Sequence, residues 1–242
     1  MITYRNTPIL VLAVLISPVL LTVSCMHRGA PGKIAPGNVA PVSPTNFLVP
    51  PDSAEKAPDA AGFLRRWLIL DPIPATGVTQ NAVQAAVKKE YFPNQFTVIP
   101  HDGDKVTVNG TELAWHALDT KFYSVSLYHF GWLVNKSTDN VLMWAVTIVN
   151  CPEEMHDVRL AIGSNDASVW WGNGQEVIGI YGDRLSVVDD GVSKKLTLKK
   201  GPNVIRCAIH NQGGMTDFCA RFLDANDKPI KNLTLSLSDT GK

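Results

Sequence analysis

Val158–Gly174, VRLAIGSNDASVWWGNG, is the stretch of sequence that decides the fold. Val158, Leu160 and Ile162 alternate with other residues, and this two-residue period is typical of a half-buried strand. Short polar residues then predict a turn, because their side chains bond the local backbone and tolerate left-handed dihedral angles. A second strand follows, and Asn173-Gly174 closes it with the strongest short signal for a hairpin. The stretch therefore predicts the central hairpin of an all-β sandwich.

The rest of the chain supports the same fold class. Short runs of β-forming residues recur about every ten residues between glycine, asparagine and aspartate turns, which favours a sandwich or jelly roll. Val141–Val149 is almost continuously apolar and predicts a strand buried on both faces. Phe122–Phe130 alternates apolar and polar residues and predicts another strand, while Thr79–Tyr91 has the spacing of one short helix. We expect an all-β protein, an antiparallel β-sandwich (jelly roll) with one short helix.

Residues 1–25 have the features of an export signal. Arg5 precedes an apolar run over residues 9–23, which is short for a membrane span and is interrupted by Pro18. Thr22-Val23-Ser24-Cys25 resembles a bacterial lipobox, in which the cysteine is lipidated, although Thr22 stands where leucine is usual. A lipid anchor at Cys25, plain secretion and a retained anchor stay open as alternatives, and all three imply export.

The next segment, residues 26–60, predicts a disordered linker. It is rich in proline and glycine, and it lacks the apolar area that would offset the entropy of ordering. We expect the folded β-sandwich domain to occupy residues 61–242, with its first strand near Phe63.

Composition excludes some classes of partner. The chain has 242 residues, and its 22 lysines and arginines balance its 22 aspartates and glutamates. A net charge of zero gives no electrostatic footprint for nucleic acid, so no nucleic-acid partner is expected. A membrane is expected as a partner only through the N-terminal lipid.

Five short motifs carry a resemblance to a known family. They are, in chain order, Trp67–Pro74 (WLILDPIP), Leu160–Asp166 (LAIGSND), Trp171–Gly174 (WGNG), Leu198–Asn203 (LKKGPN) and Asn211–Gly214 (NQGG). Together they resemble the galactose-binding-like, carbohydrate-binding-module-like jelly-roll domains of exported bacterial proteins. The resemblance covers about residues 63–238 and implies a sugar-binding role. Asp71 replaces a family glycine, and Asn165 and Ala167 replace an aspartate and a glycine, which weakens the implication of a calcium ion in that turn.

No catalytic set stands out. None of the six histidines lies in an HExxH motif, and no serine lies in a G-x-S-x-G elbow. His101, Asp102 and His210 are the only scattered candidates for a hydrolase. No cofactor is expected; the acidic turns Asn165-Asp166 and Asp189-Asp190 could offer oxygen ligands to calcium, although such residues usually just form turns.

Three cysteines remain after Cys25. We expect Cys207 to point inward and Cys219 to point outward from a neighbouring strand, so that these two could not form a disulfide. A bridge between Cys151 and Cys219 stays open, as does a free, buried Cys207.

The aromatic residues are the best candidates for binding, because the apolar faces of sugars stack on flat rings. Trp132, Trp171 and Tyr181 lie in or beside predicted turns, and Asp166 adds a polar group. Three other tryptophans lie in apolar runs and are expected in the core: Trp67, Trp115 and Trp144. Trp170 and Trp171 are consecutive and so point to opposite faces.

The sequence therefore predicts a non-catalytic, exported binding module for a carbohydrate or a cell-surface polymer. Two alternatives remain. One is an envelope structural or assembly protein that binds a partner protein, and the other is a hydrolase accessory or a cryptic hydrolase.

Overall fold

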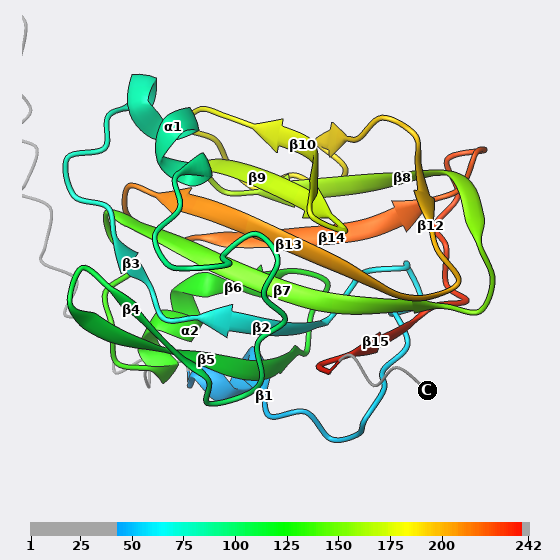
Figure 1. Cartoon of the computed structure of the whole chain (residues 1–242), viewed down its shortest axis with the longest axis horizontal. Helices are drawn as coiled ribbons and strands as arrows, with labels where there is room; N and C mark the ends of the chain where they lie inside the picture. The colour runs from blue at the N-terminus through cyan, green and yellow to red at the C-terminus, as the bar shows by residue number, and fades with distance from the viewer. Residues whose placement is uncertain (1–42, 239–242) are drawn as a thin grey trace, which may run out of the picture. The chain divides into compact units, whose positions relative to one another are not determined.

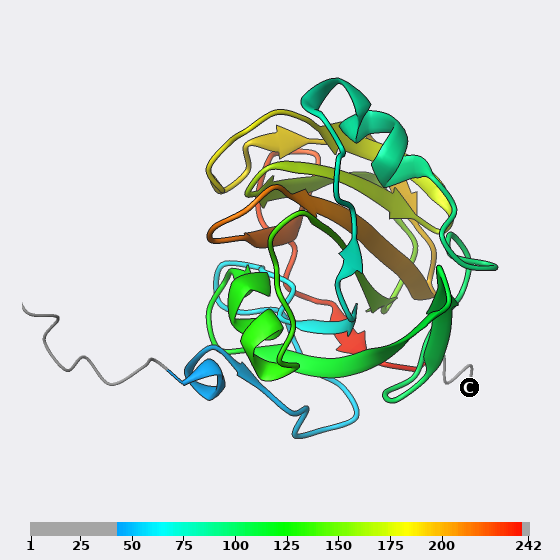
Figure 2. The same cartoon turned by 90° about the vertical axis from the view of Figure 1, so that its left-hand side faces the viewer.

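Strands are the main elements of the computed structural model, which describes residues 43–238. They form two sheets in which every strand pair is antiparallel (Figures 1 and 2). This confirms the predicted antiparallel β-sandwich. The predictions for the export signal, for Cys25 and for the first part of the linker lie outside the described residues.

The larger sheet has ten strands. Its main path runs β1 (Leu48–Val49), β5 (Thr111–Thr120), β2 (Arg66–Leu70), β7 (Val141–Cys151), β13 (Gly201–Asn211), β9 (Ala167–Gly172) and β10 (Gln175–Ile180). Three short strands pair alongside this path: β3 (Ile73–Pro74), β4 (Lys105–Val108) and β15 (Thr234–Ser236). The smaller sheet contains β11 (Gly191–Val192), β8 (Met155–Ser164), β14 (Asp217–Leu223), β6 (Val125–Ser126) and β12 (Leu196–Leu198).

The predicted central hairpin is divided between the two sheets. β8 belongs to the smaller sheet and β9 to the larger one, so the turn between them crosses the sandwich. The prediction of a direct β8–β9 pair was wrong because alternation shows that a strand has one core face, not which sheet it joins. The second turn is a true hairpin: Asn173 and Gly174 have φ angles of 49° and 81°, and they connect β9 to β10.

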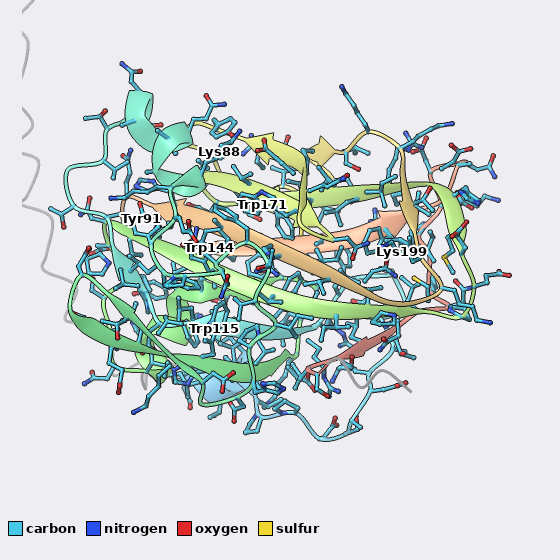
Figure 3. The ribbon with its side chains drawn as sticks, in the orientation of Figure 1. Lys88, Tyr91, Trp115, Trp144, Trp171 and Lys199 are labelled. Carbon is cyan, nitrogen blue, oxygen red and sulfur yellow. The ribbon has the colours of Figure 1, made fainter. Side chains whose placement is uncertain are left out.

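The core between the sheets contains Trp67, Trp170 and Phe218, which meet edge to face at centroid distances of 5.0–6.1 Å. A second apolar cluster covers the outer face of the larger sheet beneath the 75–98 segment. Trp115, Trp144 and Trp171 belong to this outer cluster (Figure 3). Consecutive Trp170 and Trp171 therefore bury opposite faces of β9, and β7 is buried on both faces, as its sequence predicts.

The structure contains more helix than predicted. The expected helix at Thr79–Tyr91 forms as a 3₁₀ turn, η2 (Gln80–Ala82), followed by α1 (Val83–Lys88), which buries Val83 and Val87. A second helix, α2 (Leu127–Leu133), occupies most of the segment predicted as a strand at Phe122–Phe130. That prediction was wrong because Leu127 and Phe130 bury one helical face, while the hydroxyl of Ser126 caps the amide of His129.

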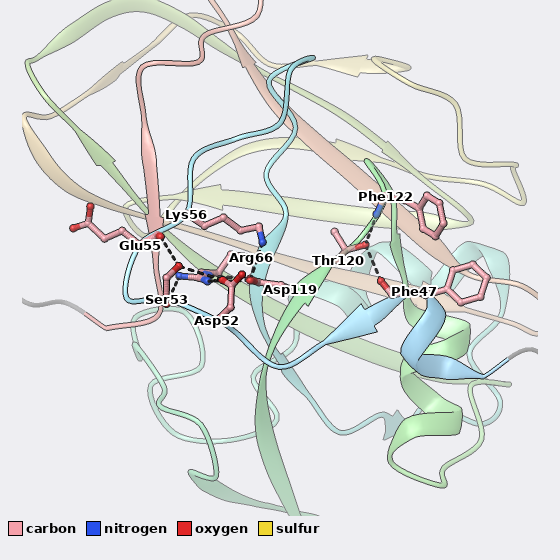
Figure 4. A network of polar contacts seen from close by, with 9 residues as sticks. All are labelled: Phe47, Asp52, Ser53, Glu55, Lys56, Arg66, Asp119, Thr120 and Phe122. Atoms are coloured by element: carbon pink, nitrogen blue, oxygen red, sulfur yellow. Dashed lines mark hydrogen bonds and ion pairs between the residues drawn. The ribbon is translucent and has the colours of Figure 1, made fainter.

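Part of the predicted linker belongs to the sandwich. A 3₁₀ turn, η1 (Pro44–Asn46), leads into β1, which pairs with β5. Lys56 then forms a bridge with Leu235 and an ion pair with Asp119 at 2.9 Å. The same carboxylate receives two hydrogen bonds from Arg66 (Figure 4). Composition could not reveal these contacts, because they depend on residues far along the chain.

The three described cysteines are buried, free thiols. Cys207 lies in the core between the sheets, as expected. Cys219 lies on β14 in the other sheet, facing away from that core, and its sulfur lies beside Gly163 with the carbonyl of Val187 close by. The expected outward orientation of Cys219 is therefore found, although the Val187 loop covers the side chain and β13 and β14 are not neighbouring strands.

Candidate functional site

Five aromatic side chains form a continuous line around α2, here called the aromatic row. The row runs Phe122, Phe47, His129, Trp132 and Tyr128, with successive ring centroids 5.6, 3.6, 5.4 and 5.0 Å apart. Phe47 and His129 are stacked with an interplanar angle of 14°. The row combines residues from the β1 segment, the loop after β5 and α2, which are brought together only by the fold.

Contacts beneath the row hold its rings in place. Leu127 and Phe130 anchor α2 in the core, and the ring of His129 hydrogen-bonds the hydroxyl of Ser126 at 2.7 Å. The amide of Tyr128 donates to the carbonyl of Thr216 at 3.0 Å. These contacts fix the helix at both its inner face and its side, so its exposed rings need little ordering when a ligand arrives.

The opposite end of the row is held through Thr120. Its hydroxyl donates to the carbonyl of Ser124 at 2.8 Å. The same hydroxyl accepts from the amide of Phe122 at 3.4 Å (Figure 4). The carbonyl of Phe47 accepts from the amide of Lys121 at 2.9 Å. The backbones that carry Phe47 and Phe122 are therefore linked directly.

The row is open to solvent at Trp132 and Phe122, whose side chains are 46% and 53% exposed. Tyr123 and Leu133, which follow Phe122 and Trp132 in sequence, are also exposed. Single exposed apolar residues are common, so it is the paired rings of Trp132 and Tyr128 that mark an interaction surface.

A hollow of about 340 Å³ lies beside the loop that leaves α2. The loop folds back onto the helix, because the amides of Asn135 and Lys136 donate to the carbonyls of Trp132 and Gly131. Polar residues of this loop line the hollow, including Lys136, Asp139 and Asn140. The loop thus packs against α2 at Gly131, the residue next to Trp132 in sequence, and presents hydrogen-bonding groups to the hollow.

The carboxylate of Asp71 holds this loop through an ion pair with Lys136. This carboxylate accepts from the amide of Ala114 at 3.0 Å, and it pairs with Lys136 at 3.0 Å and His116 at 3.1 Å. Burial would raise the pKa of Asp71, but the Ala114 amide and the Lys136 ammonium outweigh it, so the pKa is lowered. Asp71 is therefore ionised at neutral pH and holds Lys136 at the hollow. For His129, burial lowers the pKa, so its ring is neutral at pH 7.

The structure separates the four predicted binding residues. Trp132 lies in the aromatic row, whereas Trp171 is 5% exposed and stacks on Trp144, so it offers no surface for a ligand. Tyr181 is 37% exposed but follows β10, where its hydroxyl lies close to Gly179. Asp166 is 6% exposed, and its carboxylate accepts from the amide of Gln212 at 2.9 Å, which stabilises the turn after β13.

Sequence reasoning missed Phe47, Phe122, Tyr128 and His129. Tyr128 and Trp132 are four residues apart, the spacing that places two side chains on one face of a helix. This signal was present, but the segment was interpreted as a strand. No comparable signal existed for Phe47, which lies in the predicted linker.

The candidates for catalysis and for calcium have structural partners. His101 pairs with Asp104 at 3.3 Å, and Asp102 accepts from the amide of Ala117 at 2.8 Å. His210 is buried in β13, and burial lowers its pKa although the charge of Asp166 opposes this. In the acidic turns, Asp189 binds Arg221 and Asp190 binds Arg184.

Residues 43–238 contain neither a metal-binding cluster nor a membrane-spanning helix. Histidine, cysteine, aspartate and glutamate side chains form no group of three or more that could hold a metal ion there. Within the same residues, no helix combines the length and apolar character needed to cross a membrane.

Comparison with solved structures finds distant all-β neighbours. The PA14 sugar-binding domain of an RTX adhesin matches 70% of this chain and 96% of its own, with 13% identity and a TM-score of 0.38. The PA14 domain of an antifreeze protein matches 78% of this chain and 96% of its own, with 14% identity and a TM-score of 0.39. The epithelial adhesin 9 A domain from Candida glabrata, solved with Galβ1-3GlcNAc, matches 81% and 96%, with 11% identity and a TM-score of 0.36.

No protein-family model matches the chain, and no curated protein matches it. The three TM-scores lie below 0.5, so these similarities carry no argument about the function of this chain.

Proposed function

We propose that the protein is an exported, non-catalytic module that binds carbohydrate through the aromatic row. The observation that carries the proposal is the exposed indole of Trp132, 5.0 Å from the ring of Tyr128 on a firmly anchored helix. A pyranose ring has an apolar face of C–H groups, and burying that face against an indole removes apolar surface from water. Because His129 in the middle of the row is buried, we expect the sugar to stack on Trp132.

The hollow beside the loop that leaves α2 supplies hydrogen-bonding groups, which the aromatic rings lack. Sugar hydroxyls both donate and accept hydrogen bonds, and the loop residues Lys136, Asp139 and Asn140 offer both kinds of partner. A few polar groups beside an apolar platform are the usual composition of a small-molecule site. We therefore expect a ring to stack on Trp132 while its hydroxyls reach this loop.

The N-terminal sequence supports export for this module. Residues 1–25 have the sequence features of a signal, and Cys25 would carry the lipid if the lipobox is used. Globomycin sensitivity of processing and metabolic labelling with palmitate would test the anchor. Release of an unlabelled mature protein into the medium would contradict it.

Retention on a panel of insoluble polysaccharides tests the binding proposal. The wild-type protein should be retained on at least one polymer, and Trp132→Ala should weaken that retention by about tenfold or more, as for a central aromatic anchor. Tyr181→Ala is the matched control, because Tyr181 is also a partly exposed ring but lies outside the row. Retention that is equal in the wild type and in Trp132→Ala would contradict the proposal, and so would an absence of retention on every polymer.

A further inference from the structure

The open edges of the two sheets face each other across a cleft of about 470 Å³. Among residues 43–238, β10 ends the larger sheet and pairs only with β9, and β12 pairs only with β8 in the smaller sheet. Residues of both strands line the cleft, including Gln175, Glu176 and Val177 on β10 and Leu196–Leu198 on β12. In an antiparallel pair, an edge strand directs every second N–H and C=O group away from its partner. The cleft is therefore bordered by backbone groups that can accept another strand.

The floor of this cleft is apolar and its rim is basic. Leu198 and Ile205 form part of the floor and are each 1% exposed, because they belong to the core between the sheets. Three exposed lysines stand on the rim, Lys194, Lys195 and Lys199, and Lys199 follows β12 directly (Figure 3).

Charge at the rim is incompletely balanced. Lys195 lies 3.4 Å from Asp157, and Glu176 is already paired with Lys88 at 2.8 Å. Within residues 43–238, no carboxylate lies within ion-pair distance of Lys194 or Lys199. The cleft thus has free positive charge facing an occupant.

The shape of the cleft is held independently of an occupant. The side chain of Asn173 donates to Asn203 at 2.9 Å and accepts from the amide of Val204 at 3.0 Å. Asn203 also receives the amide of Lys199 at 2.9 Å. One set of hydrogen bonds therefore links the β9–β10 turn to the turn after β12 that carries Lys199.

We propose that this cleft binds an extended acidic segment of a partner protein, which adds as a strand to the edge of β10. An alternating peptide places every second side chain on one face, so apolar residues would reach the floor while acidic residues reach the lysines. A sugar fits less well, because no aromatic residue is among the described residues that line the cleft. This proposal is independent of the aromatic row.

Fluorescence anisotropy with a synthetic peptide that alternates glutamate and valine tests the proposal. We expect saturable binding that weakens with salt, since the rim is exposed. The double substitution Lys194→Glu and Lys199→Glu should weaken binding by about tenfold or more. Lys121→Glu with Lys228→Glu is the matched control, because it changes the net charge equally at exposed lysines outside the cleft.

Two further probes separate strand addition from simple charge attraction. A version of the peptide with a central proline cannot complete the hydrogen-bond ladder and should bind at least about tenfold more weakly. Hydrogen exchange of residues 175–180 should slow when the alternating peptide binds. Absence of saturable binding would overturn the proposal and leave the lysines as protection against edge-to-edge association. The proposal would also be overturned if the proline peptide or polygalacturonate bound as tightly as the alternating peptide and hydrogen exchange in β10 did not slow.

Discussion

Replacing Asp119 by asparagine should strongly destabilise the sandwich. Asp119 is 1% exposed, and its carboxylate binds Arg66 Nε at 2.8 Å, Arg66 Nη2 at 2.9 Å and Lys56 Nζ at 2.9 Å. Arg66 is fully buried, and its other carboxylate neighbour, Asp52, lies on the surface at 3.5 Å. Asp119→Asn keeps the shape but leaves the buried guanidinium without its bidentate counter-charge, so we expect a loss of about 3–5 kcal/mol in unfolding free energy.

Urea unfolding followed by tryptophan fluorescence measures this loss, because the buried indoles report unfolding directly. Lys56→Met is the control; Lys56 is partly exposed, so its loss should cost no more than about 1 kcal/mol. Arg66→Met combined with Asp119→Leu should recover much of the stability, since apolar residues of similar size avoid a buried, unpaired charge. The reasoning fails if Asp119→Asn costs less than about 1 kcal/mol, or if the double variant is as unstable as Asp119→Asn.

Three further perturbations test other parts of the structure. Burial lowers the pKa of His129 below 6.5, so the unfolded chain binds more protons than the folded one. The free energy of unfolding should therefore fall as the pH drops from 6.5 through the folded-state pKa. His129→Gln should reduce this dependence of the unfolding free energy on pH. An unchanged slope would contradict this. Trp171→Ala should cost about 3–5 kcal/mol in urea unfolding, yet leave polysaccharide retention intact below the transition; loss of retention in a folded variant would place Trp171 at the site. Burial raises the pKa of Cys151 to about 11 and of Cys219 to about 12, so in Cys25→Ser the thiols should react with Ellman's reagent only after unfolding. Rapid reaction of the folded protein would refute their burial.

Local sequence signals predicted the elements of the fold better than their pairing. Asn173-Gly174 specifies a hairpin by itself, because few other residue pairs adopt two consecutive positive φ angles. β8 and β9 belong to different sheets because β8 pairs with β14 and β9 pairs with β13. Both partner strands come much later in the chain. The alternation within β8 carries no information about those partners.

The candidate site was only partly predictable for the same reason. Trp132 was identified from its residue type and its place beside turn residues. Phe47 joins the row because β1 pairs with β5, a contact that the proline-rich composition around it conceals. Trp171 was predicted to bind a ligand because it lies beside the Asn173-Gly174 turn, but it lies on the outer face of the larger sheet. Here the 75–98 segment covers that face, and the guanidinium of Arg206 fastens it by donating to the carbonyls of Gln95 and Val98.

Tryptophan emission during a titration with oligosaccharide tests the carbohydrate site most directly. Of the six tryptophans, Trp132 is 46% exposed and the other five are at most 5% exposed, so a change caused by surface contact reports Trp132. An oligosaccharide cut from a retained polymer should shift the emission to shorter wavelength and protect it from acrylamide quenching, and Trp132→Phe should abolish both effects. Saturable binding of that oligosaccharide with no change in emission or quenching would contradict a sugar stacked on Trp132.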